Sequence, residues 1–135
     1  MFSDFSLSTI PLIHNNRIVK IGKLEKDGKD TRKKLPNVRF ILCEPFVLEG
    51  TATCATPEMP DRYERFKEVY EYARVVKSLA DEYGIPFLPL QEKFNEAAAK
   101  LGAEYYAPDG VHPNIGGSSL IATEWMKLFK EHFEA

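Results

Sequence analysis

The sequence predicts an α/β fold built on a parallel sheet, and three consecutive segments carry this prediction. Residues 38–43, VRFILC, form an almost continuous run of apolar, β-favouring residues that closes at Pro45. Residues 61–84 then repeat apolar side chains at helical spacing, and residues 85–90, IPFLPL, give a second short strand. Strand, helix and strand in this order favour a right-handed parallel crossover whose strands are covered on both faces.

The helix between the two strands has clear signals at both ends. Asp61 followed by Glu64 matches a capping box, which predicts that Asp61 is the N-cap. Gly84 predicts a left-handed C-cap, and Pro86 prevents the helix from resuming. We therefore expect one amphipathic helix that begins at the capping box and lies on the sheet.

Two further helices are expected in the last third of the chain. Residues 91–102 contain good helix formers and end at Gly102. Residues 115–133 place four apolar side chains on one face, which we expect to be core: Ile121, Trp125, Leu128 and Phe129.

The first 34 residues behave differently. Apolar residues are few from position 8 to 34, and the run KLEKDGKDTRKK is typical of a solvated helix end or loop. Ile18, Ile21 and Leu24 hint at a helical turn, and STIPLI is compatible with a strand. We expect residues 1–34 to be divergent or poorly ordered and residues 35–135 to be the folded domain. Because only two strands are predicted, the sheet is incomplete, and an exposed edge would favour association with another chain.

Composition excludes several classes of function. With 18 basic and 20 acidic residues, the net charge of −2 favours neither nucleic acid nor an anionic membrane as partner. No apolar run approaches the roughly 20 residues that cross a bilayer, and the start lacks the basic region of a secretory signal. As written the chain is predicted to be cytoplasmic, with export left open. Cys43 and Cys54 match neither a disulfide framework nor a zinc site, and we interpret Cys43 as a small buried residue.

The candidate site lies in YYAPDGVHPN, residues 105–114. Asp109 and Gly110 signal a turn, and Pro113 biases His112 toward extended backbone angles at a helix entrance. Across this turn the Asp109 carboxylate can hold one ring nitrogen of His112 and leave the other facing outward, which is the arrangement of an oriented general base. The alternative is that Asp109 only closes the turn and His112 is an exposed loop residue.

Glu44 is a weaker candidate for substrate binding. It directly follows the first predicted strand, and ligands of open α/β sheets bind at the carboxyl ends of strands. The alternative is that Pro45 ends the strand and Glu44 is solvated. Glu44 could also join Asp109 and His112 in a metal site, but the motif lacks a third ligand at local spacing, so we expect no metal there.

DGVHPN, followed by Gly116, Gly117 and LIATEW, resembles the last block of the SGNH or GDSL-type hydrolases. RFILCEPFVL, the helix after it and EYGIPFLPLQEKFNEA also resemble that family, so the similarity spans about residues 35–133. The resemblance implies a three-layer α/β/α sandwich with a parallel, flavodoxin-like sheet. It also implies hydrolysis of esters of lipids, acetylated sugars or small acyl compounds without a cofactor, with His112 as general base and Asp109 as orienting acid.

The chain departs from the family pattern at its N-terminal side. The nucleophilic serine of the family lies in a G-D-S block, and its oxyanion hole uses a Gly and the Asn of a G-x-N-D block. The nearest imitation here, SDFSL with Ser6, lacks the leading Gly and the preceding strand. We expect no nucleophile in this chain, and therefore no activity from it alone. The alternative is a non-catalytic remnant or binding module that associates through its open sheet edge.

Overall fold

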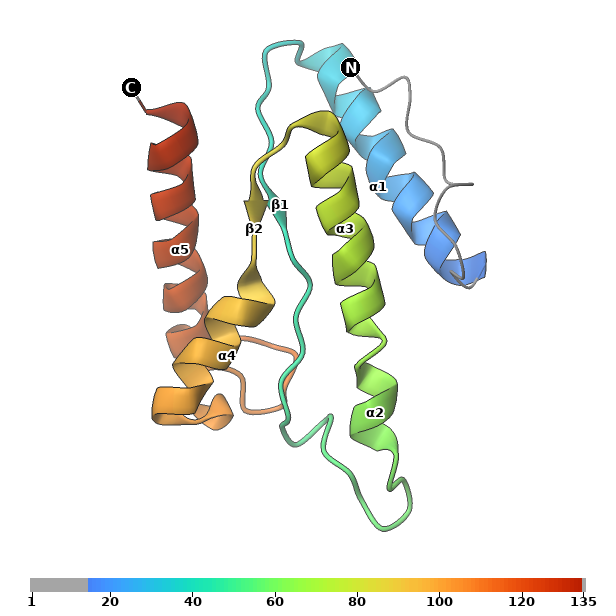
Figure 1. Ribbon diagram of the computed structural model, residues 1–135, viewed down its shortest axis with the longest axis vertical. Helices are drawn as coiled ribbons and strands as arrows, with labels where there is room; N and C mark the ends of the chain where they lie inside the picture. The colour runs from blue at the N-terminus through green and yellow to red at the C-terminus, as the bar shows by residue number, and fades with distance from the viewer. Residues whose placement is uncertain (1–14, 135) are drawn as a thin grey trace.

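The computed structural model describes residues 15–134 and, from residue 22 onward, their side chains. Helices alternate with two short strands along the chain (Figure 1). In order, the elements are α1 (Asn15–Lys34), β1 (Leu42–Cys43), α2 (Arg62–Phe66), α3 (Val69–Tyr83), β2 (Phe87–Leu88), α4 (Leu90–Leu101), the 3₁₀ helix η2 (Ala103–Tyr105) and α5 (Ile115–Phe133).

The two strands form a parallel pair, with Leu42 opposite Phe87 and Cys43 opposite Leu88. The ladder is shorter than the predicted strands 38–43 and 85–90. Pro86 faces β1 but has no N–H to donate to it, which ends the ladder on that side, and Leu90 already begins α4 on the other. Within residues 15–134, the part of the predicted first strand before β1 therefore has no strand to pair with.

The sheet lies between two helical layers, as Figure 1 shows. α5 packs beside β2, α3 packs beside β1, and α1 lies against the outer side of α3. The parallel crossover through α3 and the α/β/α arrangement are both confirmed. The two-stranded sheet of residues 15–134 is small for such a sandwich, so these residues form an incomplete version of it.

The main core lies between α4, α5 and the loops beyond the strand ends. Phe94 of α4 is fully buried, stacks on Phe46 with ring centroids 4.0 Å apart, and meets Tyr106 edge-on at 6.3 Å. Leu88 and Leu90 complete its buried centre together with Leu48 and Ala107. Two loops thus contribute core residues, and these residues anchor the loops to α4 and α5.

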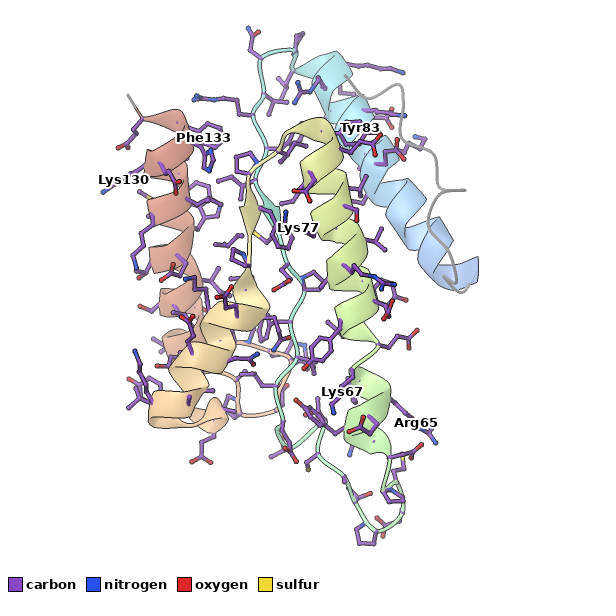
Figure 2. All side chains as sticks on the ribbon, viewed as in Figure 1. Arg65, Lys67, Lys77, Tyr83, Lys130 and Phe133 are labelled. Atoms are coloured by element: carbon purple, nitrogen blue, oxygen red, sulfur yellow. The ribbon has the colours of Figure 1, made fainter. Side chains whose placement is uncertain are left out.

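Asp61 is at the N-cap position, as predicted, but the capping box is wrong. Asp61 makes no cap hydrogen bond and accepts from Arg65 Nε at 2.8 Å, while Glu64 accepts from Lys67 Nζ at 2.7 Å. Both carboxylates are therefore held by basic side chains on exposed helical turns. The predicted single helix is divided into α2 and α3, with Arg65 on α2 and Lys67 just after it (Figure 2).

The predicted helix ends are confirmed. Gly84 has φ 62° and is the left-handed C-cap of α3, and its N–H bonds back to the last turn. Gly102, with φ 89°, follows the last residue of α4. α5 spans the predicted residues 115–133.

Two burial predictions need correction. Leu120, Ile121 and Leu128 of α5 pack against the core, but Trp125 is 36% exposed and stacks on Phe129 at 5.2 Å. This half of α5 extends beyond the two-stranded sheet, so its aromatic stripe has too little sheet to cover it. Cys43 is exposed rather than buried.

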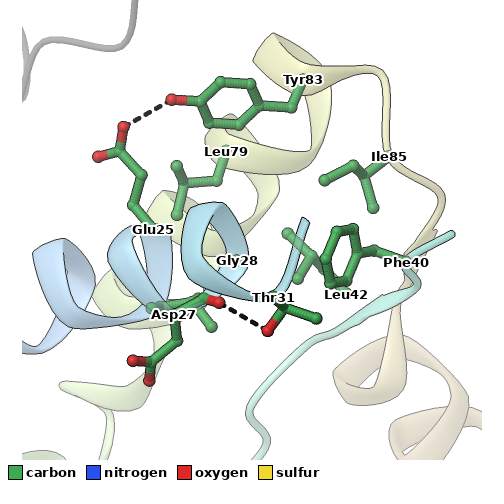
Figure 3. A pocket seen from close by; sticks show the side chains of 10 residues that line it. Glu25, Asp27, Gly28, Thr31, Phe40, Leu42, Leu79, Tyr83 and Ile85 are labelled. Atoms are coloured by element: carbon green, nitrogen blue, oxygen red, sulfur yellow. Dashed lines mark hydrogen bonds between the residues drawn. The ribbon is translucent and has the colours of Figure 1, made fainter. Parts of the chain in front are cut away.

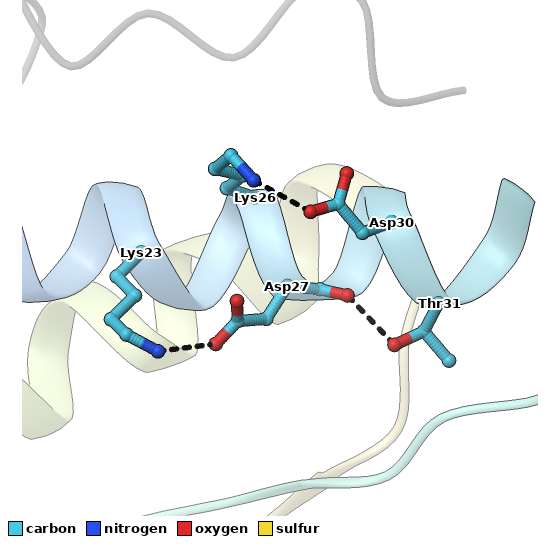
Figure 4. A network of polar contacts seen from close by, with 5 residues as sticks. All are labelled: Lys23, Lys26, Asp27, Asp30 and Thr31. Atoms are coloured by element: carbon cyan, nitrogen blue, oxygen red, sulfur yellow. Dashed lines mark hydrogen bonds and ion pairs between the residues drawn. The ribbon is translucent and has the colours of Figure 1, made fainter.

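α1 occupies the second half of the segment expected to be divergent or poorly ordered. Its charge run forms ion pairs along an exposed helical face, Lys23 with Asp27 at 3.1 Å and Lys26 with Asp30 at 2.7 Å (Figure 4). The described part of this segment is therefore a solvated helix. The expected strand STIPLI lies outside the described residues, and the domain boundary at residue 35 stays a prediction.

None of the helices in the described part of the chain combines the length and the apolar character needed to cross a bilayer.

Candidate active site

The turn that carries the candidate site is fixed by the Asp109 carboxylate. Its Oδ1 accepts hydrogen bonds from the backbone N–H groups of Val111 and His112, both at 2.8 Å. Gly110 adopts φ 94° and donates its N–H to the Ala107 carbonyl at 2.9 Å. Asp109 therefore does close the turn, as the alternative interpretation proposed.

The second carboxylate oxygen has a separate partner. Asp109 Oδ2 lies 2.6 Å from Nδ1 of His112, so the expected contact between the two side chains is confirmed. The His112 side chain is 84% exposed and that of Asp109 is 31% exposed. With Nδ1 donating to the carboxylate, Nε2 is the ring nitrogen left to exchange a proton with another molecule or segment.

Hydrogen bonds keep the Asp109 carboxylate ionised. The N–H of His112, then that of Val111 and then the His112 ring stabilise its charged form and lower its pKa from 3.8 to about 2. Because the folded pKa is the lower one, this charge stabilises the folded chain above the ordinary carboxyl pKa. That contribution is lost as the pH falls through about 2.

The start of α5 holds the dyad from the other side. Asn114 is the N-cap: its Oδ1 accepts from Gly117 N at 3.0 Å, and its Nδ2 donates to the Tyr105 carbonyl at 2.9 Å. A Cβ on Gly117 would lie 2.3 Å from the Tyr106 oxygen, so the first turn of α5 and the preceding backbone are in direct contact. His112 is thereby placed at a helix entrance, as expected from the sequence.

Glu44 lies at the carboxyl end of β1, as expected, but it is not simply solvated. Its Oε1 accepts from the Gln91 N–H at 2.7 Å in the first turn of α4, where a negative charge stabilises a helix. The Gln91 side chain in turn bonds the Val47 N–H and carbonyl. Gln91 is not among the predicted site residues, although its place at a helix start after a strand is visible in the sequence. A substrate-binding role for Glu44 stays a prediction.

The metal-site hypothesis is not supported. Within residues 22–134, the structure brings no three His, Cys, Asp or Glu side chains together as a metal site, so Glu44 does not join Asp109 and His112. Its carboxylate faces the start of α4 instead.

Comparisons with known proteins agree on one family of enzymes. The chain matches no family profile. It is 32% identical over 88 residues to an acetylxylan esterase of Geobacillus stearothermophilus, a match that covers 65% of this chain and 36% of that protein. Among solved structures, a GDSL-like lipase of Parabacteroides merdae superimposes with a TM-score of 0.69 and 33% identity, over 80% of this chain and 47% of the other.

The esterase Axe2 of Geobacillus stearothermophilus gives a TM-score of 0.60 at 29% identity, over 80% of this chain and 44% of Axe2. The chain therefore spans between about a third and a half of the length of these relatives.

Proposed function

The chain is a relative of the SGNH/GDSL-type hydrolases in sequence and fold, and on that premise we propose that it carries the acid–base pair of an ester-hydrolase active site. His112 is the general base and Asp109 holds its ring. The observation that supports this assignment is the 2.6 Å contact between Asp109 Oδ2 and His112 Nδ1 on a ring that is otherwise 84% exposed.

The proposed chemistry is acyl transfer in two steps. Nε2 of His112 takes the proton of a serine hydroxyl as its oxygen attacks the acyl carbon, and returns that proton to the leaving alcohol. It then takes a proton from water, which attacks the acyl-serine and releases the acid, and the serine oxygen recovers the proton. Throughout this cycle Asp109 stays ionised and stabilises the imidazolium.

We propose that the serine and the oxyanion donors come from sequence beyond the described residues. Ser118 and Ser119 lie exposed in the first turns of α5, and Ser78 donates to the Arg74 carbonyl within α3. None of the three stands in a G-D-S block, and Ser6 lies outside the described residues. A general base with no activated nucleophile cannot complete the reaction, so the chain alone is proposed to be inactive.

The proposed substrate class is acetyl or other small acyl esters, with acetylated sugars first. This choice follows the acetylxylan esterases among the relatives.

Turnover of p-nitrophenyl acetate and of acetylated xylo-oligosaccharides tests the proposal. It is measured on this chain and on the polypeptide extended through the upstream coding sequence. We expect the chain to show no turnover above its His112→Ala variant, and the extended polypeptide to lose about a thousandfold or more on the same substitution. His132→Ala is the matched control, because it removes an exposed histidine of α5 that lies outside the dyad. His112-dependent turnover by this chain would contradict the proposal that the chain alone is inactive. Unchanged turnover of the extended polypeptide after His112→Ala would contradict the proposal that His112 is the general base.

A second candidate function is association through the open edge of β1. Leu42 N and Glu44 N donate to the β2 segment, so by alternation the peptide groups of Cys43 point away from it. An apolar cavity of about 190 Å³ borders this edge on the α1 and α3 side, where Phe40, Leu42 and Leu79 line it (Figure 3). On the α5 side lies a cleft of about 430 Å³, lined by Arg39 and by aromatic side chains such as Trp125 and Phe129. An apolar cavity on one face and an aromatic-lined cleft on the other suit an added strand.

Light scattering with increasing concentration tests this second candidate. We expect the chain to self-associate and the Cys43→Pro variant to remain monomeric, because proline removes an N–H that the β2 pairing does not use. A compact monomer at all concentrations would exclude association between copies of the chain through this edge.

A further inference from the structure

Thr53 carries a buried hydroxyl group that the proposed mechanism does not use. Its side chain is fully buried, and Oγ1 donates to the Leu48 carbonyl at 2.6 Å while accepting from the Gly50 N–H at 2.8 Å. These two bonds close the loop of residues 48–53 on itself. A buried hydroxyl with both donor and acceptor satisfied fixes the backbone around it, since any movement would leave a polar group unpaired.

The loop closed by Thr53 holds the backbone of the dyad turn. Three successive carbonyls of that turn accept hydrogen bonds from it: Pro108 from Thr51 N at 3.0 Å, Asp109 from Ala52 N at 3.0 Å, and Gly110 from Leu48 N at 2.8 Å. The peptide groups on both sides of the Asp109 Cα atom are therefore fixed by the loop. The direction in which the carboxylate leaves the backbone is set by these bonds.

Two glycines allow the loop and the turn to meet backbone to backbone. A Cβ on Gly50 would lie 2.4 Å from the carbonyl carbon of Asp109. A Cβ on Gly110, whose φ of 94° already favours glycine, would lie 2.5 Å from Thr53 Oγ1 and 2.3 Å from the Leu48 oxygen. The Thr53 hydroxyl thus lies against the residue that follows Asp109, with no space for the turn to shift toward it.

We propose that Thr53 is a positioning residue for the Asp109–His112 dyad, which it orients by holding loop 48–53 against the dyad turn. Calling the dyad an acid–base pair rests on the proposed function, whereas the positioning itself is a property of the fold. Thr53 touches neither reacting atom and acts only through the backbone of residues 108–110.

Amide hydrogen exchange on the intact chain tests this inference without any catalytic assay. The N–H groups of Val111 and His112 donate to Asp109 Oδ1, so their exchange rates report whether the carboxylate stays in place. For Thr53→Val, which keeps the shape and removes the hydroxyl, we expect both rates to rise about tenfold or more. The His112 Nδ1–H resonance should be lost in the same variant.

Two variants separate positioning from general loss of stability. Thr53→Ser restores the hydroxyl and should return both exchange rates to within about twofold of the parent. Val75→Ala truncates a buried residue of α3 away from the loop, and should lower global stability without changing the two rates. Unchanged rates in a folded Thr53→Val chain, or equal increases in Thr53→Ser, would overturn the inference.

The unmodified chain gives an independent measurement should Thr53→Val fail to fold. If the loop holds the dyad, the amides of Leu48, Thr51 and Ala52 open together with those of Val111 and His112, with one shared dependence on denaturant. Two distinct opening free energies would overturn the inference. A failure of the proposed hydrolase activity would show only in the turnover assays and would leave these exchange rates as they are.

Discussion

The small sheet is well packed at the carboxyl ends of its two strands and poorly packed at the outer edge of β1. At the carboxyl ends of β1 and β2, the loops of residues 44–53 and 106–114 are bound to each other and to α4 and α5 by backbone hydrogen bonds and buried side chains. The outer edge of β1 is bordered by a cavity on one face and by a cleft on the other, and the aromatic rings of α5 that line the cleft are partly exposed.

This difference shows which part of the fold is self-sufficient. The loops that carry the dyad need no contact beyond the described residues to reach their geometry, because each of their anchors lies within the chain. At the outer edge, by contrast, apolar and aromatic side chains are only partly covered by the described residues. A chain of this kind holds a well-formed dyad on a scaffold that is open at one side.

Truncating the core beneath the dyad gives the largest expected effect. Phe94→Ala removes a fully buried ring that contacts Phe46 and Tyr106, and should lower the free energy of unfolding by about 3 to 5 kcal/mol. Trp125→Ala removes a larger aromatic ring system at the open side. It should cost only about 1 kcal/mol, because Trp125 is already partly exposed. Denaturant unfolding of both variants measures the difference.

Similar losses of stability in the two variants would contradict the difference in packing between the core and the open side. That result would mean that the aromatic rings of α5 are covered in solution, for example by a second copy of the chain. Repeating the unfolding at several protein concentrations separates the two explanations, because stability that depends on association rises with concentration.

The sequence predicted the elements better than their pairing. Apolar periodicity and the stops at Gly84 and Gly102 placed α3, α4 and α5, since these signals are local to each helix. Strand length failed, because it depends on a partner elsewhere in the chain and β2 lies between a proline and the start of α4. The capping box at Asp61 failed because Arg65 and Lys67 offered the two carboxylates charged partners at helical spacing.

For the site, the turn motif predicted the contact between Asp109 and His112 but not the structure that supports it. The contacts of Gly50 and Thr53 with Gly110 join two loops that are far apart in the sequence. The residues around each of them do not indicate that these loops meet. Glu44 was placed at the correct end of β1, yet its bond to the Gln91 N–H depends on where α4 begins. Long-range backbone contacts of this kind leave little trace in one sequence.

Removing the cap that links the dyad turn to α5 gives a middle-sized effect. Asn114→Ala deletes the acceptor for Gly117 N and the donor to the Tyr105 carbonyl, and should cost about 1 to 2 kcal/mol. Asp61→Ala is the matched control, because Asp61 precedes a helix but makes no cap bond. Thermal unfolding should show a clear loss for Asn114→Ala and little change for Asp61→Ala; equal losses would mean that Asp61 caps α2 in solution.

The exposed face of α1 gives a smaller effect. Lys23→Ala removes the ion pair with Asp27 on a solvated helix and should cost about 0.2 to 0.5 kcal/mol at low salt. The cost should nearly vanish near 1 M salt, where exposed charges are screened. Unfolding midpoints at the two salt concentrations measure it, and a loss that salt does not change would indicate that the Lys23 stem packs on the helix instead.

The titration of Asp109 should not change the stability of the chain near neutral pH, because it takes place only in acid. Its pKa of about 2 lies below the ordinary 3.8, so its contribution to stability is complete above about pH 4, declines below that and is gone below about 2. The carboxyl ¹³C shift of Asp109 should report this midpoint, and high salt should leave it low, because backbone N–H groups are its main partners. Asp61 is the control: Arg65 lowers its pKa through an exposed pair, so salt should raise that pKa again. If the Asp109 midpoint rises with salt as that of Asp61 does, the turn opens in solution and the carboxylate is held by His112 alone.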